Sequence, residues 1–149
     1  MKKITIQSLM IAVCCLATYF TPLHADNDKP IQVKDLPQIA QTILSQHFNG
    51  QKVVLATVET SLIDRSYDVV LQNGTKLEFD KNGRVTEVVC KQGVVPAELI
   101  PTAINHYLQE NYPDQKVWKI EIQKNEYEVE LTNGLEISFN KRYQVIDID

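Results

Sequence analysis

The chain has 149 residues, of which 44% are hydrophobic, and it carries 15 Lys and Arg against 19 Asp and Glu. The net charge of −4 argues against nucleic acid and anionic membrane surfaces as partners, because both select basic patches. The length allows one domain or two small repeats.

The N-terminus predicts a secretory signal peptide over residues 1–25. Two lysines precede a mostly apolar stretch, and the small residue Ala25 suits cleavage. The apolar run at residues 9–17 is too short to span a bilayer, which disfavours a membrane anchor. A lipoprotein is also disfavoured, because Val13 precedes Cys14 where processing requires a small residue. We therefore expect a periplasmic or secreted protein that is not inserted in the membrane after cleavage. The cleaved chain would carry 13 basic and 19 acidic residues, a net charge of −6.

Cleavage would leave Cys90 as the single cysteine, so no internal disulfide is expected although the exported compartment permits one. Cys90 alternates with Thr86 and Val88 in a predicted strand, which favours a buried thiol that behaves as a small hydrophobe. An intermolecular disulfide is the functional alternative, and a non-reducing gel would separate the two interpretations.

Residues 26–34 are polar and predict a short leader, after which a helix is expected. Asp35 fits the N-cap of this helix with Gln38 as its reciprocal partner, and Pro37 lies in the first turn. Apolar residues follow at helical spacing and give the helix one apolar face. Gly50 ends it, because glycine adopts the left-handed conformation that a helix C-terminus needs.

Four strand-like runs follow, at residues 53–59, 67–71, 75–79 and 84–90. Asn73-Gly74 joins the second and third runs and predicts a tight hairpin, because both residues of such a turn need positive φ. Asp80-Lys81-Asn82-Gly83 predicts the next hairpin turn. A calcium loop there is disfavoured, since it needs ligands at alternate positions and a Glu several residues on.

The pattern starts again after a linker at residues 91–96. A second amphipathic helix is expected from near Leu99, with Pro101 in its first turn. Further strands are expected at 117–123, 126–131, 135–139 and 144–148. The two units align at an offset of 64 through the helices and of 60 from Tyr67 onward, so the first has four extra residues in the loop at 60–66.

These patterns predict an α+β protein of two tandem α-β-β-β-β repeats, at residues 35–90 and 97–149, each a helix packed on a four-stranded antiparallel sheet. A unit of about 60 residues is marginally stable alone, so the two are expected to pack together. Each helix covers only one face of its sheet. The residues expected on the covered faces are Val54, Ala56, Val58, Tyr67, Val69, Leu71, Leu77 and Phe79 in the first unit, and Trp118, Ile120, Ile122, Tyr127, Val129, Leu131, Ile137 and Phe139 in the second.

The tandem α-β4 pattern behind a signal peptide resembles the exported PepSY-like family, also described as β-lactamase-inhibitor-like. The motifs that carry the resemblance are Val95-Pro96-Ala97-Glu98-Leu99-Ile100-Pro101 before the second helix, Asn111-Tyr112-Pro113-Asp114 after it, and residues 127–139, with a weaker copy in the first unit. The resemblance implies two repeats whose sheets form a common curved surface, a non-enzymatic domain and a bacterial envelope location. The inhibitor label is an analogy of fold.

No catalytic or metal-binding motif stands out, and we predict no enzymatic activity and no cofactor. His47 and His106 lie in different predicted helices at positions that are not equivalent between the repeats, and no Gly-x-Ser-x-Gly or His-Glu-x-x-His motif occurs. Trp118 is expected in the core, with a binding anchor as its alternative because Trp is enriched in interface hot spots.

The outward sheet faces differ between the units, being apolar and mixed in charge in the first and acidic in the second. A solvated face is the plain interpretation. The functional hypothesis is a docking site for another exported or envelope protein, such as a hydrolase or protease that the chain inhibits. An envelope sensor that binds a small ligand or peptide is the alternative, and the oligomeric state is left open. The candidate binding residues are Val53, Leu55, Leu62, Ile63, Val70, Glu128, Glu130 and Glu136.

Overall fold

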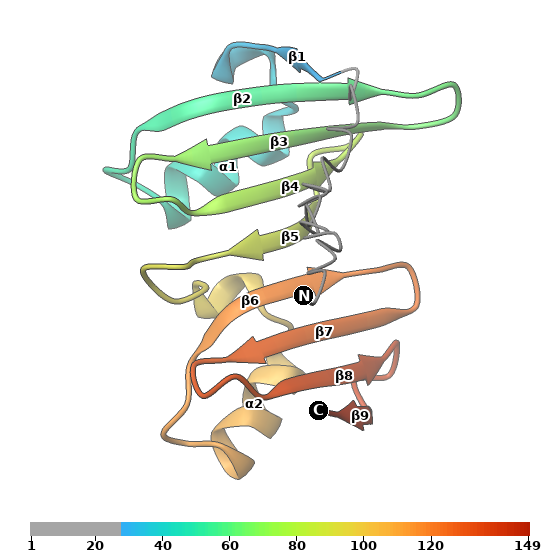
Figure 1. Ribbon diagram of the computed structural model, residues 1–149. Helices are drawn as coiled ribbons and strands as arrows, with labels where there is room; N and C mark the ends of the chain where they lie inside the picture. The colour runs from blue at the N-terminus through green and yellow to red at the C-terminus, as the bar shows by residue number, and fades with distance from the viewer. Residues whose placement is uncertain (1–27) are drawn as a thin grey trace, which may run out of the picture.

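The computed structural model describes residues 28–149, so the predicted signal peptide and its cleavage site lie outside the described residues. The fold is α+β, with helices α1 (Gln38–His47) and α2 (Thr102–Asn111) against one face of an antiparallel sheet (Figure 1). The nine strands of the sheet follow chain order. They are β1 (Lys29–Pro30), β2 (Val53–Thr60), β3 (Arg65–Leu71), β4 (Lys76–Asp80), β5 (Val85–Val89), β6 (Val117–Ile122), β7 (Glu126–Leu131), β8 (Glu136–Asn140) and β9 (Val145–Ile148).

A single sheet runs through both halves of the chain, because β5 pairs with β6 and places Val88 opposite Ile120. The family resemblance implies such a common surface, but the residues alone do not show that the two sheets are continuous. Strand β1 lies within the predicted leader and pairs with the start of the sheet through Pro30 opposite Thr57. Proline is tolerated there because an edge strand has no further neighbour that needs its missing N–H.

Both α-helices start later than the sequence predicts, because a short 3-10 turn precedes each one, at Val33–Asp35 and Ala97–Leu99. Asp35 is therefore not the N-cap of α1, which is Pro37. The Asp35 carboxylate instead accepts a hydrogen bond from the Gln32 backbone N–H at 3.1 Å. Gly50 has φ of 85° just after α1, as a helix-ending glycine requires.

Side-chain amides satisfy the carbonyl groups where each 3-10 turn meets its helix. In the first half, Gln41 Nε2 donates to the Leu36 carbonyl at 2.8 Å. In the second half, Asn105 Nδ2 donates to the Ala97 carbonyl at 2.7 Å. These bonds hold the turn and the helix at a fixed angle, because each ties a helix residue back to the segment before it.

The Asn-Gly hairpins are three-residue loops, so the expectation of positive φ at both Asn73 and Gly74 was wrong. Gly74 alone has positive φ, at 81°, and the Leu71 N–H donates to the Thr75 carbonyl at 2.8 Å. A type I turn followed by one left-handed residue gives this geometry. The turn before Gly83 has the same form, and there the Asp80 carboxylate accepts backbone N–H groups at 2.8 and 2.9 Å, so the turn prediction is confirmed.

Bulges change which side chains point into the core at the start of two strands. Val53 lies opposite Leu71 and Leu55 lies opposite Val70, so Val54 is an extra residue in β2. Val53 therefore packs against the core and Val54 is 56% exposed, the reverse of what the alternation predicts. A bulge has this effect because it adds one residue to one strand only.

Trp118 is the equivalent bulge residue in β6, between Val117 and Lys119. Val117 is buried in the core, whereas Trp118 is only partly buried and lies outside the core cluster. The prediction that Trp118 fills the core was therefore wrong, for the same reason as at Val54.

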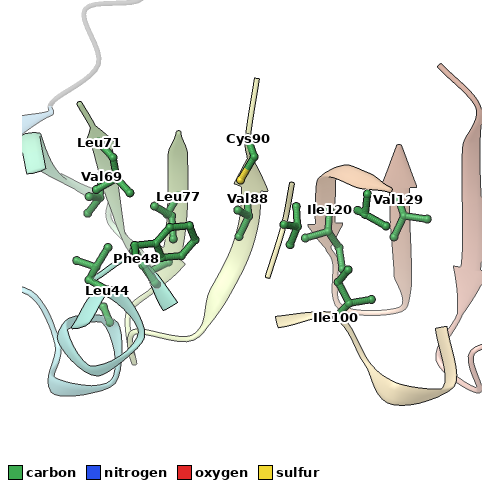
Figure 2. Packing of buried hydrophobic residues seen from close by; sticks show 14 of the residues in the cluster. Leu44, Phe48, Val69, Leu71, Leu77, Val88, Cys90, Ile100, Ile120 and Val129 are labelled. Carbon is green, nitrogen blue, oxygen red and sulfur yellow. The ribbon is translucent and has the colours of Figure 1, made fainter. Parts of the chain in front are cut away.

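The core lies between the sheet and the two helices. Leu44 and Phe48 face Val69, Leu71 and Leu77 in the first half, and Ile100 lies beside Ile120 in the second (Figure 2). Phe79 and Phe139 are completely buried at matching places in β4 and β8. Cys90 is 3% exposed and joins the same cluster, which confirms a buried thiol. None of the helices described over residues 28–149 is long and apolar enough to cross a membrane.

Candidate functional site

The sheet face opposite the helices carries a continuous row of acids that runs across the strands. Consecutive pairing places one carboxylate from each of β3 to β7 directly opposite the next. We call this set the acidic row, and its members are Asp68, Glu78, Glu87, Glu121 and Glu128. Neighbouring strands lie about 4.8 Å apart, so like charges repel one another along the row.

The acidic row perturbs the titration of its own members. Partial burial, followed by the charges of Glu87 and Asp68, raises the pKa of Glu78 to about 7. A side-chain hydrogen bond with Glu87 acts in the same direction, because it favours a proton shared between the two carboxyl groups. The row therefore gains or loses a proton near neutral pH.

Lys119 is the cation that lies nearest to one end of the acidic row. Its Nζ donates to Glu128 Oε1 at 3.2 Å and lies 3.8 Å from Glu121 Oε2. Partial burial lowers the pKa of Lys119, but the hydrogen bond with Glu128 and the charges of the neighbouring glutamates together outweigh it, so that the pKa is raised overall. Lys119 therefore stays charged and neutralises the β6–β7 end more than the β4–β5 part of the row.

The middle of the row lines a shallow hollow of about 400 Å³. Glu78, Glu87 and Glu121 contribute to its wall, together with Thr86 and the β6–β7 turn. Gln123 Nε2 donates to Glu121 Oε1 at 2.9 Å and fixes that carboxylate. A concave surface lined by three carboxyl groups suits a cationic side chain, because charge-assisted hydrogen bonds are the stronger ones.

A second row runs parallel to the acidic row and changes from apolar to acidic along its length. We call it the mixed row, and it contains Leu55, Val70, Lys76, Val89, Lys119, Glu130 and Glu136. Leu55 is 47% exposed. The charge of Glu128 and some burial raise the pKa of Glu136, which shows that the two rows interact at their acidic end.

The structure places five of the eight predicted binding residues on the same open sheet face, spread from β2 to β8. Leu55, Val70, Glu130 and Glu136 lie in the mixed row, and Glu128 lies in the acidic row. The other three lie elsewhere. Val53 packs against the core because of the bulge and is not on the open face, whereas Leu62 and Ile63 stand at the tip of the β2–β3 hairpin.

Sequence reasoning missed the acidic row as one feature, and in particular the part played by Glu87. The alternation of Thr86, Glu87 and Val88 could have placed Glu87 on the outward face. It could not have placed Glu87 opposite Glu121, because that contact depends on the pairing of β5 with β6.

The two histidines of the described part of the chain contact different acids: His47 lies 4.0 Å from Glu98 and His106 lies 3.3 Å from Glu110. No group of three or more His, Cys, Asp or Glu residues within 28–149 is arranged to hold a metal ion. Burial raises the pKa of the Cys90 thiol, which makes it a poor nucleophile.

A family model described as "Putative beta-lactamase-inhibitor-like, PepSY-like" matches residues 65–147, which is more than half of the chain. The chain belongs to this family. The matched region runs from β3 to the penultimate residue of β9 and so includes every member of the acidic row. No curated protein matches the sequence of this PepSY-like chain.

Solved structures of similar proteins share the fold of the PepSY-like chain over most of its length. A protein from Bacteroides vulgatus, described as a "putative periplasmic protein from DUF2874 family", is 55% identical, with a TM-score of 0.82 over 84% of this chain and 98% of its own. A protein from Bacteroides thetaiotaomicron, described as a "putative calcium-regulated periplasmic protein", is 50% identical, with a TM-score of 0.78 over 82% and 96%. A second B. vulgatus protein, described as a "putative periplasmic protein of unknown function", is 36% identical, with a TM-score of 0.76 over 82% and 98%.

Proposed function

We propose that the chain is an exported, non-enzymatic binding module, built from two α-β4 repeats, whose open sheet face docks a basic segment of another envelope protein. The acidic row is the observation that carries this proposal. Five carboxylates in line across five strands attract cationic side chains and repel acidic competitors, so they give specificity and fast association. Export is supported by the periplasmic descriptions of the similar structures.

The apolar half of the mixed row supplies the anchor for such a partner. Leu55 on β2 and Val70 on β3 lie opposite each other on the open face, and β3 also carries Asp68 of the acidic row. Apolar contact is needed because each exposed ion pair contributes only about 0.2–1 kcal/mol. An apolar anchor next to the acidic row is also the arrangement expected of an inhibitor that covers a basic site on an exported hydrolase or protease.

Binding of short peptides tests the docking proposal. An extended peptide with alternating Lys and Val should bind the immobilised protein, and one with alternating Glu and Val should not. Combined Glu87→Gln and Glu121→Gln should weaken binding about 2–30-fold by removing two charge pairs. Glu110→Gln on α2, away from the open face, is the matched control. Equal binding of the two peptides, or no effect of the double substitution, would refute docking through the acidic row.

A second candidate is an envelope sensor of a small ligand, and calcium is the concrete case. It is favoured by the calcium-regulated description of the B. thetaiotaomicron protein together with the acid-lined hollow. A cation there would have to join neighbouring carboxylates, since no preformed cage of three ligands exists among residues 28–149. Calorimetric titration with CaCl₂ should then show saturable binding that is lost in Glu87→Gln. If CaCl₂ released no more heat than a matched titration with MgCl₂, or than dilution into buffer, the calcium-sensor candidate would be eliminated.

A further inference from the structure

The outer edge of β9 is open to another strand. β9 is the last strand in the order of the sheet, and no strand within residues 28–149 pairs with its outer side (Figure 1). The opposite edge of the sheet is protected, because Pro30 of β1 has no N–H to offer an added strand. No proline interrupts β9, and the side chains that it turns to the helix side, Val145 and Ile148, are apolar.

The internal repeat shows what covers the equivalent edge in the first half. Val88 of β5 and Ile148 of β9 hold the same position, since they lie opposite Leu77 and Ile137 of the preceding strands. Val88 is completely buried, with β6 beside it and Ile120 opposite. Ile148 has no such neighbour among the described residues and is 44% exposed. The edge of β9 is therefore a strand-binding position of this fold that residues 28–149 do not fill.

The main-chain groups of Ile148 face away from β8. The Asp149 N–H donates to the Glu136 carbonyl, and the Asp149 carbonyl accepts the Glu136 N–H, both at 3.0 Å. Neighbouring residues of a strand turn their N–H and C=O groups to opposite sides, so those of Ile148 point to the open edge. The bulge at Ile146 does not close this edge, because β5 has the same bulge at Thr86 and still pairs with β6.

The side chains that β9 turns to the open face are acidic. Asp147 lies opposite Ser138, at the β9 end of the line of the acidic row, and Asp149 follows it. No ion pair within residues 28–149 involves either aspartate. The cations nearest in sequence, Lys141 and Arg142, line a hollow beside the β6–β7 turn instead. Pairing of β9 with a second copy of itself would bring like charges together, whereas a basic strand is complementary.

We propose that the edge of β9 binds an extended basic segment of another protein as an additional antiparallel strand, in the register that β6 has on β5. The segment places a cation opposite Asp147, an aliphatic residue opposite Ile148 and a second cation opposite Asp149. Strand β6 has this pattern in Lys119-Ile120-Glu121, apart from the acid at its last position. Main-chain hydrogen bonds supply affinity, and the alternation of side chains supplies specificity. The contact uses neither the acidic row nor the mixed row, so it is independent of the docking proposed above.

NMR titration of the isotope-labelled protein tests this strand addition. The probe is a capped peptide with the sequence of β6, Val-Trp-Lys-Ile-Glu-Ile, in which lysine replaces the glutamate. It should shift the amide signals of β9 in a saturable way and slow the hydrogen exchange of the Ile148 N–H. The first isoleucine of the peptide corresponds to Ile120, whose N–H faces β5, because the Trp118 carbonyl two residues earlier accepts the Cys90 N–H.

Methylation of single peptide nitrogens shows whether the peptide binds as a strand. N-methylation of that first isoleucine should weaken binding at least about 10-fold, because it removes the donor that faces β9. N-methylation of either neighbouring lysine, whose N–H faces away, should change binding less than about 3-fold. Equal effects at the three positions, or no binding at about 5 mM peptide, would overturn the proposal.

A charge exchange identifies the site. Wild type should prefer the lysine peptide to the unaltered β6 peptide, and Asp147→Lys should reverse this preference, each by about 2–30-fold. Asp114→Lys, in the exposed loop after α2, is the matched control and should leave the preference unchanged.

Combined Glu87→Gln and Glu121→Gln separates this site from the acidic row and should leave the binding of the lysine peptide unchanged. Loss of binding in that double variant, or shifts confined to β3–β7, would place the peptide on the acidic row. That result would overturn strand addition to β9 and leave the proposed docking through the acidic row intact.

Discussion

Replacing Glu78 by Gln should stabilise the protein at alkaline pH and leave its stability unchanged at acid pH. Burial and the neighbouring acids raise the pKa of Glu78 from 4.5 to about 7 in the folded state. The charged carboxylate therefore opposes folding. This cost is absent below about pH 4.5, grows as the pH rises towards 7, and is constant above, because the unfolded chain releases the proton first.

The magnitude follows from the same shift. A change from 4.5 to about 7 corresponds to an upper bound of about 3.4 kcal/mol at 1.36 kcal/mol per pKa unit. Glu78 is an exposed residue, so solvent screening reduces this to about 1 kcal/mol. We expect Glu78→Gln to raise the free energy of unfolding by about that amount at pH 8, which corresponds to a rise in Tm of about 4 °C.

Urea unfolding at pH 4 and pH 8, followed by the fluorescence of the single Trp118, measures this difference. Glu126→Gln is the control, because Glu126 lies opposite Asn140 rather than another acid. The part of the gain that comes from the charges of Glu87 and Asp68 should shrink in 1 M salt, where the screening length falls to about 3 Å, whereas the part that comes from burial should remain. A loss of stability at pH 8, or the same change at both pH values, would show that ionisation of Glu78 does not oppose folding.

Three further substitutions or probes test other parts of the fold. Gly83→Ala should lower the free energy of unfolding in urea by about 2–4 kcal/mol, because φ is 82° and the added Cβ would lie 2.8–2.9 Å from the start of α1. Gly134→Ala is the comparison: its φ is similar but its surroundings are open, so it should lower the same free energy by about 1 kcal/mol. Asn105→Ala should lower the free energy of unfolding by about 1 kcal/mol, since the amide caps two carbonyls before α2; an unchanged denaturation midpoint would contradict that role. The Cys90 thiol, buried and with a raised pKa, should react with a thiol reagent at least about 100-fold more slowly in the native state than in denaturant, and equal rates would mean that the site opens readily.

Local sequence signals predicted the elements well but missed their fine structure. Each predicted strand begins and ends within two residues of an observed one, because alternation and turn glycines act over a few residues, whereas the short strand β1 was not predicted. The predicted start of α1, with Asp35 as its N-cap, was wrong because a 3-10 turn precedes the helix. Contacts such as the hydrogen bond from Gln41 to the Leu36 carbonyl fix that turn. These contacts depend on how the chain enters the core, which no short window of sequence contains.

The element types, their order and the resemblance to the PepSY-like family follow from the residues alone. Which side chains share the open face depends on how the strands pair. Because residues 53 and 54 are both valine, the sequence does not indicate which of them faces the core. The bulge that buries Val53 and exposes Val54 therefore cannot be predicted from the local sequence. The acidic row likewise needs β5 to pair with β6 in one register, with Glu87 opposite Glu121. A shift of one residue would turn each carboxylate to the other face, so the row exists because buried residues of both halves, such as Val88 and Ile120, hold that register.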